Sequence, residues 1–211
     1  MKKPVLSLAV LLGLATANAV AATTDLTITG TITPVACTPT LSNGGLVDYG
    51  VLSLTELEVG VTTYRLPAKS LNLTIDCSAP ATIAVIATDN RRDSSHEYPW
   101  QFGLGLYDDR AIGFYTLQWR NSETAVDGGN GYNLLSQDGG STWTPSSPIN
   151  LQDAGKVPDF RASFANVDGR SPTAVTHVTA TVNVLGYIHN YLTLNDNADL
   201  DGSATIEIVY L

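Results

Sequence analysis

The chain of 211 residues has few of the residue types that metal centres, redox sites and nucleophilic catalysis use. It contains only two cysteines and three histidines, and the histidines (His96, His177 and His189) are far apart in the sequence. None of them stands in a recognisable nucleophile or metal-ligand motif. We therefore expect no catalytic site, no metal site and no cofactor, and we do not expect an enzyme.

Basic residues are also scarce. Lysine and arginine together number 11, against 20 aspartates and glutamates, for a formal net charge of −9. Such a chain lacks the positive surface that attracts phosphate backbones and anionic lipids. The charge balance therefore argues against nucleic acid and against an anionic membrane surface as partners.

The one long apolar run lies at the start of the chain. Val5 to Ala15 is too short to span a bilayer, follows Lys2 and Lys3, and precedes small residues around Ala21. We predict that residues 1–21 are a signal peptide and that the protein is exported. Without the two lysines of the leader, the mature chain has 9 basic and 20 acidic residues, a net charge of about −11.

The two cysteines, Cys37 and Cys77, both follow the leader. In an oxidising compartment an isolated pair most simply forms one disulfide. A metal site or a redox pair is less consistent with two cysteines so far apart and with no clustered histidine. We predict a structural disulfide that contributes ~4 kcal/mol on the loop-entropy account.

Helical periodicity is missing, and segments with a period of two recur between Gly, Pro, Asn and Asp clusters. Many short strands with such turns predict an all-β protein, a β-sandwich in one domain. The turn Asp108–Ala111 is expected to join two of these strands as a hairpin. The expected strands are 24–32, 46–52, 71–77, 81–87, 102–107, 112–119, 174–187 and 203–211.

The two ends of the mature chain resemble those of subunits of chaperone–usher pili. The first expected strand carries alternating apolar residues around a glycine, Cys37 follows it, Cys77 ends a later strand, and Tyr210 is the penultimate residue. Three further segments, 102–105, 136–143 and 201–206, are similar to an uncharacterised fimbrial-like exported family encoded beside fimbrial chaperone and usher genes. This second resemblance covers essentially the whole mature chain.

The resemblance implies an incomplete immunoglobulin-like β-sandwich with a free N-terminal donor strand. It divides the chain into a signal peptide (1–21), a donor-strand extension (22–36) and a pilin-like domain (37–211). The implied donor residues are Leu26, Ile28, Gly30 and Ile32. The implied edge of the acceptor groove, which a chaperone would also contact, consists of Ala204, Ile206, Ile208, Tyr210 and Leu211.

The function implied by this resemblance is that of a structural or adhesive fimbrial subunit that polymerises by donor-strand complementation. Its partners would be a periplasmic chaperone, an outer-membrane usher and neighbouring subunits. The protein would pass through the periplasm to the cell surface. The chain is longer than an ordinary pilin, and the excess lies around residues 90–159.

An Asp-box motif, S-x-D-x-G-x-T-W, occurs once, in residues 136–143. Its Ser and Asp brace a tight turn through backbone hydrogen bonds, and its glycine permits unusual dihedral angles. One copy in so short a chain cannot build a propeller, so we predict a structural hairpin and no sialidase activity. The motif residues are Ser136, Asp138, Gly140, Thr142 and Trp143.

The polar segment 195–202 faintly resembles a calcium loop. Its expected late glutamate is out of place at Glu207, and a polar turn before the last strand explains the segment better.

Aromatic residues gather between positions 98 and 143, and exposed rings there could stack on sugars. An extracellular carbohydrate-binding adhesin module that recognises a host glycan is thus the alternative function. We favour the simpler interpretation that residues such as Tyr115 and Trp119 fill the sandwich. A secreted hydrolase using Asp108, Asp109 or Glu123 ranks third, because acidic residues at turns explain these carboxylates better.

Overall fold

A computed structural model describes residues 24, 26–31, 34–95 and 98–211. The expected signal peptide, the donor residue Ile32 and His96 lie outside the described residues. The chain divides into two units after Thr33, and the second unit, Pro34–Leu211, holds every described strand. We call this second unit the body.

The described residues form an all-β protein whose helices are single 3-10 turns. Within the described ranges, no helix is long and apolar enough to cross a membrane. The 3-10 turns are η1 (Ser42–Gly45), η2 (Leu54–Glu56), η3 (Arg92–Ser94) and η4 (Asn121–Glu123). The strands are β1 (Cys37–Leu41), β2 (Glu58–Val59), β3 (Thr63–Arg65), β4 (Lys69–Ala81), β5 (Ile83–Asp89), β6 (Phe102–Gly103), β7 (Leu106–Tyr107), β8 (Arg110–Ala111), β9 (Gly113–Trp119), β10 (Thr124–Val126), β11 (Gly129–Asn130), β12 (Tyr132–Ser136), β13 (Thr144–Pro145), β14 (Ile149–Asn150), β15 (Arg161–Ala165), β16 (Val175–His189) and β17 (Ala204–Tyr210).

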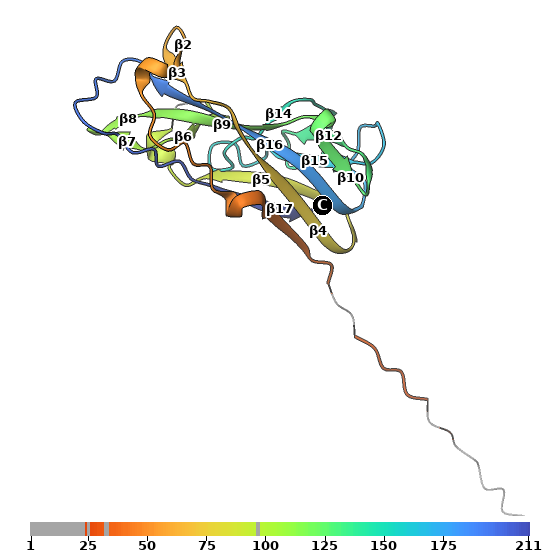
Figure 1. The fold of residues 1–211 in the computed structure, drawn as a ribbon. Helices are drawn as coiled ribbons and strands as arrows, with labels where there is room; N and C mark the ends of the chain where they lie inside the picture. The colour runs from red at the N-terminus through yellow and green to blue at the C-terminus, as the bar shows by residue number, and fades with distance from the viewer. Residues whose placement is uncertain (1–23, 25, 32–33, 96–97) are drawn as a thin grey trace, which may run out of the picture. The chain divides into compact units, whose positions relative to one another are not determined.

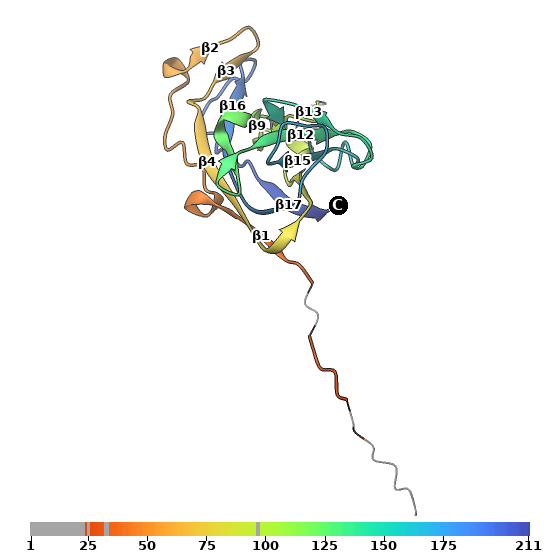
Figure 2. The ribbon, with the colours of Figure 1, turned by 90° about the vertical axis from the view of Figure 1, so that its right-hand side faces the viewer.

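Two antiparallel sheets stack to form a β-sandwich, as the alternating pattern predicted (Figures 1 and 2). The ten-stranded sheet contains the order β1-β4-β16-β10-β11, and β9 also pairs with β16. The five-stranded sheet has the order β13-β12-β15-β5-β17. Inward-facing residues of both sheets make one core, in which the rings of Trp119 from β9 and Phe164 from β15 stack at 5.7 Å. Burial of this apolar surface is the main favourable term for such a fold.

Period-two alternation predicts the longest strand correctly. In β16 the residues Val178, Ala180, Val182 and Val184 are buried, and the residues between them are half-buried or exposed. Because successive side chains of a strand point to opposite faces, this pattern places one face of β16 on the core.

The predicted hairpin forms between β7 and β8, but its turn is only Asp108–Asp109, because Arg110 and Ala111 are β8. Asp108 and Asp109 both have positive φ, +48° and +60°, as two-residue hairpin turns with the twist of a sheet require. The excess residues, 90–159, do not make a separate lobe within the described chain. They supply β9 to the ten-stranded sheet, and β12 and β13 to the five-stranded sheet.

Two strand predictions within the body were wrong. Residues 46–52 are not a strand: the carboxylate of Asp48 accepts the backbone N–H of Gly50 at 2.7 Å, and Gly50 has a φ of +60°. This local turn competes with sheet pairing. Residues 102–107 are not one strand either, because Gly105, with a φ of +93°, separates β6 from β7.

The predicted disulfide is confirmed. Cys37 on β1 lies directly opposite Cys77 on β4, and their sulfur atoms are bonded. It closes a sequence separation of 40 residues and links β1 to its neighbour β4 within the ten-stranded sheet.

Candidate functional site

Strand β17 forms an open edge of the five-stranded sheet. Among the described strands it pairs only with β5, in antiparallel register. At its ends, Ser203 O accepts the N–H of Asn90 and Leu211 donates its N–H to Thr82 O, both at 3.0 Å. Hydrogen-bonded pairs alternate along an antiparallel ladder, so the odd-numbered residues of β17 turn their backbone groups toward β5.

The even-numbered residues of β17 therefore turn their N–H and C=O groups toward the open side. They are the four expected groove-edge residues that lie in β17: Ala204, Ile206, Ile208 and Tyr210. The fifth, Leu211, differs, because its N–H points toward β5 and bonds to Thr82 O. The side chains of the first three also pack against the core. Thr205 and Glu207, on the other face, are exposed. Ala204, Ile206 and Ile208 thus combine backbone groups that point to the open edge with side chains that pack on the core.

Strand β1 is the facing edge of the ten-stranded sheet. Ser78 donates its N–H to Ala36 O at 2.9 Å, so the same alternation turns Cys37, Pro39 and Leu41 away from β4. Because Pro39 has no N–H, the β1 edge offers an added strand fewer backbone hydrogen-bond donors than the β17 edge does. At one end the two edges meet, where Cys37 donates its N–H to the Tyr210 hydroxyl oxygen at 2.6 Å.

At the other end the two edges separate around a groove of about 330 Å³. Its floor is the inner face of the ten-stranded sheet, and its walls are residues 41–49 and 200–206. The lining residues are mainly apolar, including Leu41, Val47, Tyr49, Leu71, Leu104, Tyr115, Leu117, Val182, Val184 and Ile206. We call this space and the open edge of β17 the acceptor groove.

The early end of β1 explains why the groove is open. Asn43, Gly44 and Gly45 in η1 all have positive φ and divert the chain after Leu41. Strand β4 continues beyond the register of β1, from Leu73 back to Lys69. Among the described strands, none therefore pairs with that part of β4 on this side.

An ion pair holds one wall of the groove. Arg91 donates from Nε and Nη2 to the two carboxylate oxygens of Asp201, at 2.7 and 2.8 Å. The hydrogen bond from Arg91 lowers the pKa of Asp201. Asp201 also donates its backbone N–H to Leu104 O, which positions the chain just before β17. Sequence reasoning missed this pair because its two residues are 110 positions apart.

The extension was predicted to contain the strand 24–32, but its described part forms no strand. Residues 26–31 have no regular secondary structure, and Leu26 and Ile28 each expose 87% of their surface. A side chain added at Gly30 would meet nothing within 4 Å.

The Asp-box residues form a braced turn between β12 and β13. Asp138 accepts hydrogen bonds from the hydroxyl groups of Ser136 and Thr142 and from the backbone N–H of Thr142, at 2.6 to 2.9 Å. Hydrogen bonds from Thr142 and Ser136 lower the pKa of Asp138 to about 2. A methyl group added at Gly140 would contact the half-buried Trp143 at 3.4 Å and the terminal Leu211 at 3.5 Å. These interactions explain the motif as local structure.

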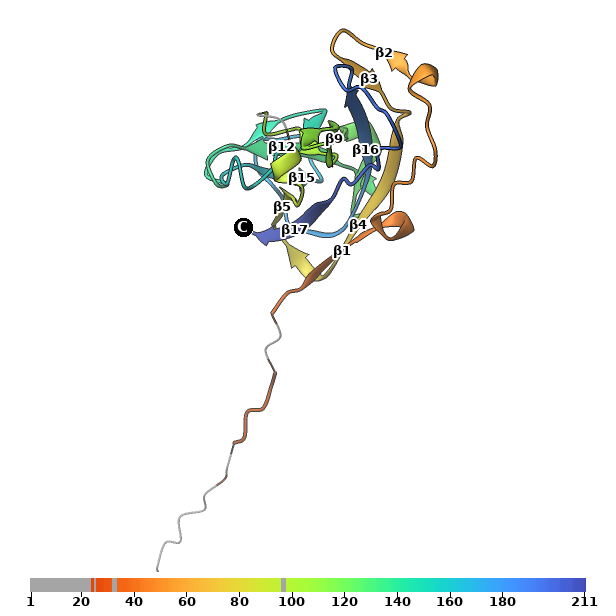
Figure 3. The ribbon, with the colours of Figure 1, turned by 90° about the vertical axis from the view of Figure 1, so that its left-hand side faces the viewer.

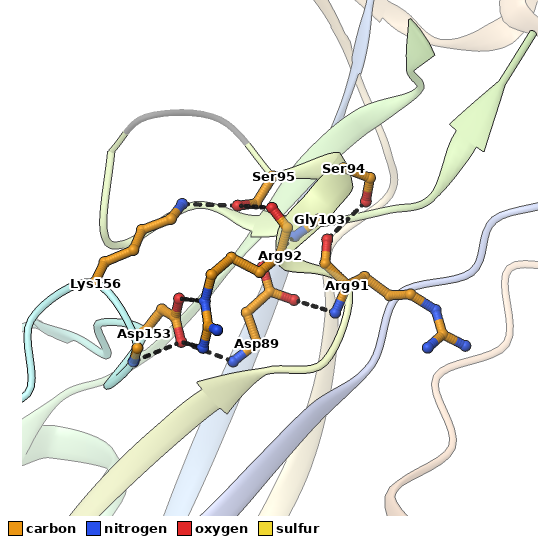
Figure 4. Close-up of polar contacts among 9 residues, drawn as sticks. Asp89, Arg91, Arg92, Ser94, Ser95, Gly103, Asp153 and Lys156 are labelled. Atoms are coloured by element: carbon orange, nitrogen blue, oxygen red, sulfur yellow. Dashed lines mark hydrogen bonds and ion pairs between the residues drawn. The ribbon is translucent and has the colours of Figure 1, made fainter. Parts of the chain in front are cut away.

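A buried polar network fixes the end of β5 (Figure 4). The fully buried side chain of Asp153 accepts two hydrogen bonds from Arg92, at 2.6 and 2.9 Å, and one from the N–H of Asp89. Asp89 in turn accepts the N–H groups of Gly103 and Arg91. Both carboxylates therefore bond to groups of their own chain. No motif or spacing in the sequence predicted that Asp89 and Asp153 lie together.

The two carboxyl groups differ in their pKa. Burial raises the pKa of Asp89 above its ordinary value, despite the two N–H donors. Burial also acts to raise the pKa of Asp153, but the hydrogen bonds from Arg92 and from two backbone N–H groups outweigh it and lower that pKa.

The other residues weighed from sequence have structural surroundings. Asp196 accepts the Tyr107 hydroxyl at 2.7 Å, so the segment that resembles a calcium loop is tied to the β7–β8 hairpin. Within the described residues, no three His, Cys, Asp or Glu side chains are grouped so as to hold a metal ion. Tyr115 and Trp119 fill the core, as the simpler interpretation predicted. Tyr98 and Trp100 differ: they are 45% and 38% exposed, and their rings stack at 5.0 Å.

Comparisons with known proteins find similarity to proteins without a described activity. A family described as "Protein of unknown function (DUF1120)" matches residues 26–113. The chain is 27% identical to the "Uncharacterized protein YhcF" of Escherichia coli (strain K12), over 86% of this chain and 87% of that protein. It is 29% identical to "Protein GltF" of the same strain, over 89% and 88%. Neither description names a ligand or a partner.

Proposed function

We propose that this protein is a structural or adhesive subunit of a chaperone–usher fimbria, assembled by donor-strand complementation. The observation that carries the proposal is the acceptor groove. It combines an unpaired strand edge among the described strands with an opening onto the apolar core of the sandwich, and it supports the interpretation that the sandwich is incomplete and immunoglobulin-like. An edge of this kind is a template for another strand, and strand addition is a general mode of association.

The extension has the pattern and length that such a groove needs. Leu26–Ile32 and Ala204–Tyr210 are both seven residues long. The four donor residues alternate with threonines, and the four groove-edge residues alternate with residues of the outer face. Both segments lack charge on the side that would meet the groove.

The energetics are adequate for a stable joint. Burying Leu26, Ile28 and Ile32 contributes ~1.5–3 kcal/mol each before ordering costs. Each added ladder hydrogen bond contributes a net ~0.5–1.5 kcal/mol. Until a neighbour supplies this strand, the open groove favours aggregation, so a periplasmic chaperone that covers it, and an usher that exchanges it, follow from the proposal.

A self-complemented variant tests the groove. The native extension is removed, and residues 24–33 are attached after Leu211 through a flexible linker of about 12 residues, which can span β17 in either direction. We expect the melting temperature to rise by about 10 °C over the variant without the added strand. A few kcal/mol of net stabilisation corresponds to such a shift in a domain of this size.

The matched control carries Ile28→Asp in the added strand and should show no rise. Equal melting temperatures for the variants with and without the added strand would refute the proposal.

A second candidate function, glycan binding by an adhesin, is favoured by the exposed Tyr98–Trp100 stack. Aromatic faces of this kind stack on sugar rings. A glycan array probed with the self-complemented protein and with its Trp100→Ala variant tests it. Binding that the variant loses supports a lectin, and no binding by either protein removes this candidate.

A further inference from the structure

Two small apolar patches lie on the surface of the body. The first, the hairpin patch, consists of Val59, Val61 and Tyr191, which are 70%, 97% and 57% exposed. The second, the terminal patch, consists of Val35, Tyr210 and Leu211, which are between 37% and 50% exposed.

The hairpin patch is held together by the pairing of β3 with β16. Val61 is in the turn between β2 and β3, and its carbonyl oxygen accepts the side-chain amide of Asn190 at 3.1 Å. Asn190 also donates its backbone N–H to Thr62 O at 3.1 Å, which places Tyr191 beside this turn. Val59 lies opposite Tyr64 in the same hairpin.

The terminal patch is held together by the hydrogen bond between Cys37 N–H and the Tyr210 hydroxyl oxygen. Val35 is two residues before Cys37, and Leu211 directly follows Tyr210. The chain enters the body at Pro34, next to Val35, so the extension is attached beside this patch.

The patches are at opposite ends of the body. On β16, His177 is paired with Asp76, next to the disulfide, and Ile188 is paired with Tyr64 of the β2–β3 hairpin. Eleven residues of strand separate these positions, a distance of about 36 Å. Figures 1 and 3 show β2 and β3 at the end of the body away from β17 and the C-terminus.

The acceptor groove links the two ends. The bond between Cys37 and Tyr210 closes it at the terminal patch, and it is open where Val184 of β16 lines it. The hairpin patch lies beyond this open end, four residues further along β16 at Ile188. A neighbour whose extension enters by the open end would bring its own terminal patch next to the hairpin patch.

We propose that the hairpin patch of one copy packs against the terminal patch of a second copy of this chain. The contact is heterologous and repeats head to tail, and contacts of this type build open filaments. It rests on the proposed function, because the donor strand brings the two patches together, and it adds a second point of contact between the bodies of successive subunits.

Engineered cysteines test the geometry in the mature full-length chain. Leu211→Cys with Val61→Cys should give a ladder of disulfide-linked dimers, trimers and longer species on a non-reducing gel. Each single variant should give no ladder. The matched control is Leu211→Cys with Val51→Cys, since Val51 is fully exposed and outside both patches. A ladder as strong in the control, or a dimer from Val61→Cys alone, would overturn the proposal.

A charge substitution in the hairpin patch tests this contact independently of the acceptor groove. Val61→Asp should weaken self-association of the mature chain about tenfold, as expected for loss of a central apolar contact. It should leave the melting-temperature gain of the self-complemented variant unchanged. Unchanged self-association of Val61→Asp would refute the contact between the patches without affecting the proposal for the groove. If the parent self-complemented protein shows no rise in melting temperature, the proposed function itself is refuted.

Discussion

At the residue scale, two polar sites with several hydrogen bonds each serve the fold. Asp138 braces the Asp-box turn, and Asp153 receives Arg92 in the buried network. Both carboxylates accept several hydrogen bonds, which favours their charged form. Their titration is therefore linked to stability.

The lowered pKa of Asp138 predicts how the stability of the protein depends on pH. Its pKa of about 2 in the folded protein is below the value of about 3.9 expected for the unfolded chain. The unfolded state therefore binds the proton first, and stability from Asp138 is complete above about pH 4 and is lost as the pH falls toward 2. Melting temperatures measured from pH 2 to 5 should fall less steeply in Asp138→Asn than in the parent. Equal slopes would contradict this role.

At the element scale, the strands of the groove depend on supports outside the groove. Strand β5 carries the open edge strand β17, and the network of Asp89, Arg92 and Asp153 fixes the end of β5 to the loop after β14. The Arg91–Asp201 pair fixes the chain that leads into β17. The two arginine side chains are about equally exposed, but the carboxylate of Asp153 is fully buried whereas that of Asp201 is 61% exposed.

Arg92→Ala should therefore destabilise the protein by about 2–3 kcal/mol, because it leaves the buried carboxylate of Asp153 without its charged partner. Arg91→Ala, the matched control, should have a much smaller effect, since water replaces an exposed partner readily. Urea denaturation followed by tryptophan fluorescence measures both. Similar losses in the two variants would show that burial of the carboxylate is not the cause.

At the scale of the whole molecule, acidity opposes self-assembly. Without the predicted leader the chain has a net charge of about −11, which makes any two copies repel each other, and salt screens that repulsion over about 10 Å at 0.1 M. The proposed contacts are apolar, so salt does not weaken them directly.

Self-association of the mature chain should therefore be stronger at 0.5 M than at 10 mM sodium chloride. Sedimentation velocity at both concentrations measures the change. Weaker association at high salt would indicate that ion pairs, and not the apolar groove and patches, join the copies.

The sequence alone was sufficient for the features that depend on local chemistry. Period two in residues 174–187 predicted β16, the Asp108–Ala111 turn predicted a hairpin, and two isolated cysteines predicted the disulfide. It did not predict that residues 46–52 lie outside the sheets. Their apolar alternation is typical of a strand, but the hydrogen bond between Asp48 and Gly50 N–H forms a local turn instead.

Only the tertiary structure decided where the sandwich is open. The acceptor groove depends on β1 ending at Leu41 while β4 continues, and on β17 having β5 as its one neighbour among the described strands. The buried pair of Asp89 and Asp153 joins positions 64 residues apart. A strand can be predicted from the alternation of neighbouring residues. An open sheet edge and a buried charge depend instead on which distant strands pair, and the packing of the whole sandwich determines that pairing.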